Sequence, residues 1–120
     1  MTQGVIPASL LRAGEMKVSK VFLAAVTVAC TLIAADVQNG KTVYERACRS
    51  CHGLDGTPNP AIAKMFRVEM RSLPSRDVQA TSDDEIKKII ADGKGKMRPV
   101  KTVAGSSLDD VVAYVRSLKK

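Results

Sequence analysis

Apolar side chains recur every three or four positions in three stretches of this chain, the spacing that gathers side chains on one face of an α-helix. In order along the chain, these apolar positions are Val43, Tyr44, Ala47 and Cys48, then Ile86, Ile89 and Ile90, and then Leu108, Val111, Val112, Val115 and Leu118. The first group predicts a helix over residues 40–51. All three stretches have helical spacing, so we expect an all-α fold.

Residues that begin and end helices flank the other two stretches. Ser82 with Glu85 three positions later forms a capping box, and Gly93 suits the left-handed position that follows a helix. These signals predict a second helix between them. Ser106 and Ser107 each precede an acidic residue by three positions, so we expect the last helix to begin there.

The connections between these helices differ in composition. Residues 53–60 are rich in Gly, Pro, Asn and Asp and predict a loop. Pro60 suits the first turn of a short helix over residues 61–66. Residues 67–80 have weak periodicity and predict an irregular segment, and residues 93–100 form a loop rich in glycine and lysine.

The first predicted helix ends on Cys48-Arg49-Ser50-Cys51-His52, a C-x-x-C-H motif with the spacing of covalent haem attachment. One helical turn presents both sulfurs to a porphyrin edge, where two vinyl groups become thioethers. The adjacent His52 offers an imidazole nitrogen to the iron. We expect a carbonyl of the following loop, that of Pro60, to accept a hydrogen bond from the other imidazole nitrogen. The motif predicts one haem c per chain, bound by Cys48, Cys51 and His52.

Two other kinds of site use the same residue types. A thioredoxin-like redox pair would follow a strand in a βαβ pattern, which is absent before Cys48. A closed structural zinc site needs four ligands, whereas His52 is the single histidine and the third cysteine, Cys30, lies in a segment predicted to be removed. Both alternatives are therefore weaker than haem attachment.

Residues 16–35 have the organisation of an export signal: a short basic start, an apolar run, and small residues ending at Ala35. The run is shorter than the roughly 20 residues of a membrane span, although an uncleaved membrane anchor is the alternative. Residues 1–15 precede a complete signal, so we interpret them as a misassigned extension and Met16 as the true start. The domain then covers residues 36–120, in the periplasm or an equivalent exported space.

Composition adds to this picture in two ways. Aromatic residues make up 3% of the 120-residue chain and tryptophan is absent, so we expect a haem to supply the centre of the core. The net charge of +7 would suit nucleic acid, but an exported domain does not meet nucleic acid, and we expect no such partner.

Three groups of residues together identify a family. They are Gly40…Tyr44…Cys48-x-x-Cys51-His52-Gly53, then Gly93-Lys94-Gly95-Lys96-Met97, then Val112-x-Tyr114-Val115-x-x-Leu118. In this order and spacing they resemble the class I, small bacterial monohaem cytochromes c over nearly all of residues 38–120. The resemblance implies a cytochrome c fold of three to five helices wrapped around one covalently bound haem. It also implies that the first and last helices cross near Gly40 and Tyr114.

The second axial ligand has to be sought among the methionines, because the chain has no second histidine. Met97 follows a long excursion of the chain and lies in a loop, as in the family, so we expect it to bind the iron opposite His52. Met65 and Met70 lie close behind the motif and are expected to pack against the ring, with iron ligation as their alternative role. Arg98 departs from the family, which usually has proline directly after the methionine.

The resemblance implies an electron carrier and not an enzyme, because two filled axial positions leave no site for a substrate. We expect a monomer that accepts electrons from a dehydrogenase or a quinol-oxidising complex and passes them to an oxidase or reductase. One alternative is a haem subunit of a larger redox enzyme complex. Another is a sensing haem with an open sixth position, although class II cytochromes of that kind carry the motif near the C-terminus.

Basic residues crowd the loop that carries Met97. They are Lys94, Lys96, Arg98 and Lys101, with no acidic residue between Gly93 and Ser107. This pattern predicts a positive rim that orients an acidic redox partner. The alternative is a solvated loop without function.

Overall fold

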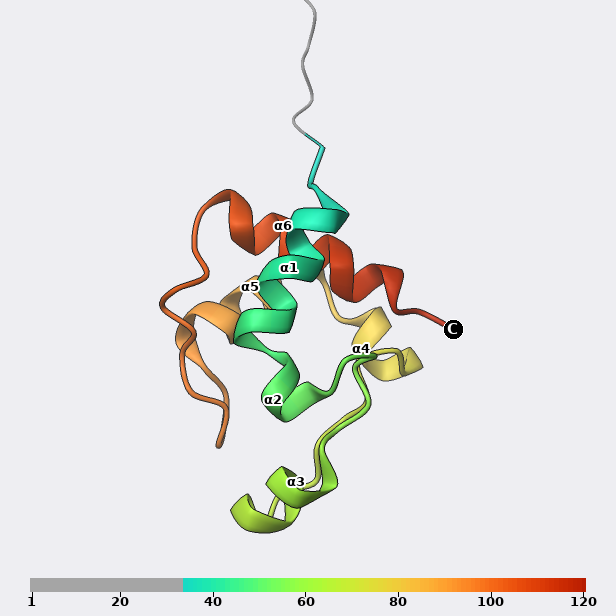
Figure 1. Ribbon diagram of the computed structural model, residues 1–120, viewed down its shortest axis with the longest axis vertical. Coiled ribbons are helices and arrows are strands. Elements are labelled where there is room, and N and C mark those ends of the chain that lie inside the picture. The colour runs from blue at the N-terminus through green and yellow to red at the C-terminus, as the bar shows by residue number, and fades with distance from the viewer. Residues whose placement is uncertain (1–33) are drawn as a thin grey trace, which may run out of the picture. The chain divides into compact units, whose positions relative to one another are not determined.

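The computed structural model describes residues 34–120 of the chain. Its helices are α1 (Val37–Ala47), α2 (Arg49–His52), α3 (Pro60–Phe66), α4 (Arg76–Ala80), α5 (Asp83–Asp92) and α6 (Ser106–Ser117) (Figure 1). In this part of the chain the only β-structure is an isolated bridge between Lys94 and Met97. The all-α prediction is confirmed. The two shortest helices, α2 with four residues and α4 with five, bring the total to six where three to five were expected.

Two predictions concern residues before residue 34. The extension over residues 1–15, and the export signal up to residue 33, lie outside the described residues. Within residues 34–120 no helix has the length and apolar character that crossing a membrane requires.

Helix α1 begins three residues earlier than predicted. Asp36 precedes it in extended conformation, and its carboxylate accepts hydrogen bonds from the backbone N–H groups of Gln38 (2.8 Å) and Asn39 (3.0 Å). This side chain therefore satisfies two of the amide groups that a helix leaves unpaired at its start. The predicted continuous helix over residues 40–51 is also interrupted, because Cys48 adopts φ −122° and separates α1 from α2.

The closest helix crossing joins α1 and α6 at Gly40. A Cβ atom at this position would lie 1.9 Å from the carbonyl oxygen of Asp110 and 3.1 Å from Cβ of Tyr114. The two backbones therefore touch where only glycine leaves room. One turn later, the rings of Tyr44 and Tyr114 pack with their centroids 5.0 Å apart. The crossing that the family resemblance implied is confirmed.

The hydrophobic core follows the predicted apolar faces. Its buried members are Val43, Tyr44, Ile86, Ile90, Val103, Val111, Val112, Tyr114 and Val115. Val103 lies between helices and belongs to no periodic stretch, so the sequence pattern did not identify it. The sequence did identify the start of α5, where the Ser82 hydroxyl accepts from the backbone N–H of Glu85 at 3.2 Å.

Gly93 ends α5 differently from the prediction. Its φ is +80°, but its ψ of 169° is extended and not left-handed helical. A Cβ atom there would lie 2.6 Å from the carbonyl oxygen of Met97, so glycine is needed both for the backbone angle and for the close approach of the next loop.

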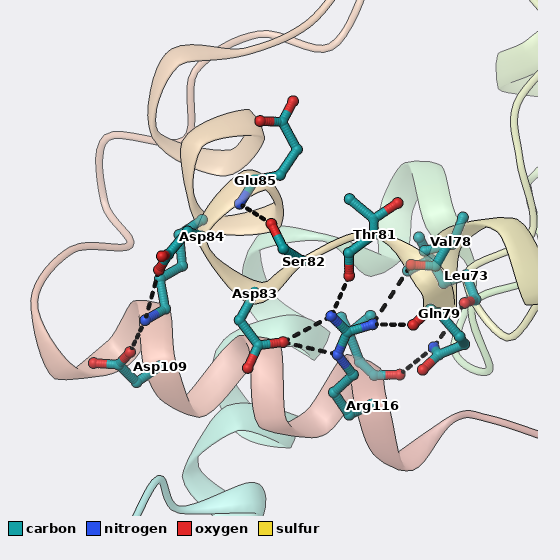
Figure 2. Close-up of polar contacts among 12 residues, drawn as sticks. Leu73, Val78, Gln79, Thr81, Ser82, Asp83, Asp84, Glu85, Asp109 and Arg116 are labelled. Atoms are coloured by element: carbon teal, nitrogen blue, oxygen red, sulfur yellow. Dashed lines mark hydrogen bonds and ion pairs between the residues drawn. The ribbon is translucent and has the colours of Figure 1, made fainter.

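The segment predicted to be irregular contains the short helix α4, which Arg116 of α6 stabilises (Figure 2). The Arg116 guanidinium donates to the carbonyl oxygens of Gln79, at 2.8 Å, and Thr81. Its Nε atom also donates to the Asp83 carboxylate at 2.8 Å, at the start of α5. These bonds come from a residue distant in sequence, so local periodicity contains no sign of α4.

Candidate functional site

Two adjoining cavities lie between the helices, with volumes of about 330 Å³ and about 710 Å³. Seven residues line both: Cys48, His52, Arg71, Leu73, Val78, Lys94 and Met97. Since the cavities share these walls, they are two parts of one space. Most of the remaining wall of the smaller cavity is apolar, with Ile86, Ile89 and Val111 among its side chains. Apolar cavities of this size with a few polar groups are typical of cofactor sites.

The two cysteines and the histidine of the motif meet in this space. The single turn of α2 carries Cys51 and His52, and the backbone N–H of His52 donates to the carbonyl of Cys48 at 3.0 Å. All three residues line the larger cavity, and each is partly buried. Both thiols are free. The spacing of the motif therefore places two thiols and an imidazole on one wall of the larger cavity.

The imidazole of His52 has a buried nitrogen, Nδ1, with no hydrogen-bond partner among the described residues. Burial lowers the pKa of His52 from its ordinary value, which favours the neutral imidazole that metals bind. The predicted hydrogen bond to the carbonyl of Pro60 is not formed, so that prediction is wrong in this structure. A buried polar atom without a partner is rare in proteins and indicates that the site accommodates a further group.

Two tyrosines hold the chain that follows His52. Tyr44 is fully buried and its hydroxyl donates to the carbonyl oxygen of Gly53 at 2.7 Å. The Tyr114 hydroxyl donates to the carbonyl of Leu54 at 3.3 Å. Helices α1 and α6 thus each fix one residue of this loop, and through it the position of the imidazole.

Burial raises the pKa of the Cys48 thiol to about 11, and the neighbouring Cys51 adds to the shift. Cys48 is therefore protonated at neutral pH, unlike the low-pKa cysteine of a thioredoxin-like pair. Within residues 34–120 no three side chains of His, Cys, Asp and Glu gather as the ligands of a zinc site. The structure supports neither alternative to haem attachment.

Met97 lies in the same space as His52, on a tight turn. The backbone N–H of Lys94 donates to the carbonyl of Met97, and the N–H of Met97 donates to that of Lys94, both at 2.9 Å. A further bond from the N–H of Val100 to the carbonyl of Ile90, at 2.8 Å, ties the end of the loop to α5. The loop is thus well held although Arg98 replaces the usual proline.

The other methionines differ from Met97 in position. Met70 lines only the larger cavity, and Met65, with 64% of its surface exposed, lines neither. The expectation that Met65 packs against the ring is wrong, because α3 directs it to solvent. The sequence also missed Arg71, which lines both cavities from an irregular segment without a recognisable pattern.

The residues present fit a haem. Two free thiols, an imidazole with an unpartnered nitrogen and a thioether line one largely apolar cavity, and this donor set matches covalent attachment with nitrogen and sulfur available to iron.

Comparisons with known proteins agree with this fit. The family model described as "Cytochrome C oxidase, cbb3-type, subunit III" matches residues 35–115. Cytochrome c6 of Synechocystis sp. is 31% identical over 91 residues, which cover 71% of this chain and 68% of that protein. Among solved structures, the KustC0563 c-type cytochrome is similar with a TM-score of 0.58 and 31% sequence identity, over 68% of this chain and 98% of that chain.

The fold, the cavity and these relatives agree on one cofactor, haem c with its iron, and on a role in electron transfer. The chain therefore belongs to the cytochrome c family, as a small class I c-type cytochrome.

Proposed function

We propose that this protein is an exported one-electron carrier whose haem c is attached through Cys48 and Cys51, with His52 and Met97 as the two iron ligands. The observation that carries the proposal is that His52 and Met97 line both parts of the same cavity. Haem supplies an iron that alternates between the ferric and ferrous states. The chain supplies attachment, ligation and a mostly apolar surrounding.

The ligands account for a carrier in preference to an enzyme. With His52 and Met97 both holding the iron, no coordination position would remain for a substrate. A thioether stabilises ferrous iron more than a second imidazole does, so Met97 as a ligand would give the haem a higher potential. The tyrosine bonds behind His52 and the turn bonds at Met97 hold both ligands in place, which limits rearrangement when the charge of the iron changes.

The proposed partners are redox proteins with an acidic docking surface. Lys94, Lys96 and Arg98 are exposed at the edge of the larger cavity, and none of the ion pairs among residues 34–120 involves them. Lys101 differs, because its Nζ donates to the carbonyl of Ala91 at 3.1 Å and stabilises the end of α5. We therefore assign the positive charge that would attract an acidic partner to Lys94, Lys96 and Arg98.

Export is the remaining part of the proposal. It rests on the signal pattern over residues 16–35, and it places the carrier in the periplasm or an equivalent space. A donor there would be a dehydrogenase or a quinol-oxidising complex, and an acceptor an oxidase or reductase.

Carbon monoxide binding to the ferrous protein tests the ligand assignment. Wild type should bind none at neutral pH, whereas Met97→Ala should bind it because the sixth position opens. Met65→Ala, on an exposed side chain, is the matched control and should behave as wild type. Met97→His should stay six-coordinate with a much lower potential. If Met70→Ala opens the site and Met97→Ala does not, the assignment of Met97 is wrong.

A second function has one supporting observation. The matching family model describes a subunit of an oxidase, so the chain could instead be a haem subunit held in a larger complex. Isolation of the native protein under mild conditions separates the two: a carrier elutes alone, whereas a subunit co-purifies with its partners in fixed stoichiometry.

A further inference from the structure

Asp110 is a buried carboxylate at the crossing of α1 and α6. Its exposed fraction is 7%, and it is the only charged residue buried among residues 34–120. One carboxylate oxygen accepts from the backbone nitrogen of Asp36 at 2.7 Å, and the other accepts from the Asn39 side-chain amide at 2.6 Å. These hydrogen bonds lower the pKa of Asp110, that from Asn39 most strongly. Asp110 is thus ionised and tied to the start of α1.

No cationic side chain among residues 34–120 neutralises this carboxylate. The ion pairs of the described region join Lys41 to Glu45, Lys87 to Asp84 and Asp109, and Arg116 to Asp83. Neutral donors alone hold the charge, and a cationic donor at the same place would add Coulombic attraction to the hydrogen bonds already formed. As long as the nitrogen of Asp36 belongs to a peptide bond, Asp110 therefore has only neutral donors among residues 34–120.

That nitrogen stands directly after the small residues Ala34 and Ala35, where the sequence predicts signal cleavage. We propose that cleavage between Ala35 and Asp36 creates an α-ammonium group that forms an ion pair with Asp110 and locks α1 onto α6. Hydrolysis consumes one water, leaves a carboxylate on Ala35 and frees the amine of Asp36. The amine is largely protonated at neutral pH, since an α-amino group has a pKa of about 7.7–8.0.

The ion pair links removal of the signal to completion of the fold. Before cleavage the Asp36 amide is a neutral donor to the carboxylate, and after cleavage the same atom carries a positive charge, which adds Coulombic attraction to the hydrogen bond. The contact also joins positions 74 residues apart, at the point where Gly40 brings the two helices into backbone contact. Processing would then stabilise the crossing itself.

This inference rests on the export proposed above, and intact mass tests that part first. The haem-loaded protein recovered from the exported fraction should begin at Asp36. A chain beginning at another residue, or one retaining the signal, would overturn the inference, while the spectrum and carbon monoxide test of the carrier role would be unaffected.

Denaturant unfolding then tests the ion pair. The matched control is a processed form with two extra alanines before Asp36, which keeps the N–H donor but moves the charge away. The free form should have an unfolding equilibrium constant about tenfold smaller than that of the extended form, because a positively charged donor adds Coulombic attraction to the carboxylate. In Asp110→Asn chains the two forms should be equally stable.

Equal stability of the free and extended forms with Asp110 intact would refute the ion pair. So would a difference of the same size in wild-type and Asp110→Asn chains, since the effect of the extension would then be independent of the carboxylate. If Asp110→Asn prevents haem attachment, the stabilities of the free and extended forms with Asp110 intact still test the ion pair.

Discussion

Replacing Gly40 by alanine should destabilise this cytochrome strongly, although alanine is the better helix former. In an exposed helix interior the change stabilises by about 1 kcal/mol. Here the new Cβ would lie 1.9 Å from the backbone carbonyl oxygen of Asp110, a contact that no side-chain rotation relieves. Helices α1 and α6 would have to move apart to relieve it.

That movement would disturb what lies next to the crossing. Tyr44 and Tyr114 pack with ring centroids 5.0 Å apart one turn away, and their hydroxyls hold the loop behind His52. Overpacking of a core costs about 1–3 kcal/mol, and a clash with backbone belongs at the upper end. For a domain of this size, about 3 kcal/mol lowers the melting temperature by roughly 12–24 °C.

Thermal and guanidinium unfolding of the ferric protein, followed by helix content and by haem absorption, measures the effect. Lys41→Ala on the neighbouring exposed position is the control: it removes only the solvent-exposed pair with Glu45, at 3.8 Å, and should change stability by less than about 1 kcal/mol. A Gly40→Ala protein as stable as wild type would refute the close crossing of α1 and α6.

Three further predictions concern charged residues. Arg116→Met should destabilise the fold by about 2–3 kcal/mol, because it leaves carbonyls at the end of α4 without donors. Asp83→Asn, which removes only the exposed partner of Arg116, should cost less than about 1 kcal/mol. Equal losses of the two variants in chemical denaturation would contradict this. Lys96→Glu should slow second-order electron transfer to an acidic partner at low salt in stopped-flow measurements. The difference in rate between the variant and wild type should shrink as ionic strength rises, because the screening length is about 8 Å at 0.15 M. Lys119→Glu should have little effect on the rate. The hydrogen bonds that lower the pKa of Asp110 contribute stability that is present above the ordinary carboxyl pKa and is lost as pH falls through the lower folded value. In Asp110→Asn, the stability should therefore depend less on pH below about pH 4. An acid unfolding transition identical to that of wild type would contradict this prediction.

The sequence predicted what local periodicity and short motifs determine. The apolar faces of α1, α5 and α6 became the core, because helical spacing alone decides which side chains share a face. The capping box at Ser82 formed its predicted bond. The motif around Cys48 brought two thiols and an imidazole to one cavity wall, since that grouping needs only one helical turn.

What the sequence did not predict depends on contacts between distant residues. Helix α4 needs the guanidinium of Arg116 from another helix, and Arg71 reaches the cavity from a segment without regular spacing. The break at Cys48 is a backbone conformation that a continuous apolar face conceals. Met97 could be selected only through the family resemblance, because periodicity does not say which loops face the same space.

The pairing of α1 with α6 also has a consequence for the order of events during biogenesis. Contacts between positions such as Asp36 and Asp110, 74 residues apart, can form only when both ends of the domain are present. Until α6 has been synthesised, α1 and the thiols that follow it have no partner helix. If Cys48 and Cys51 attach the haem as proposed, an open chain of this kind leaves both thiols accessible, so attachment can precede closure of the fold instead of competing with it.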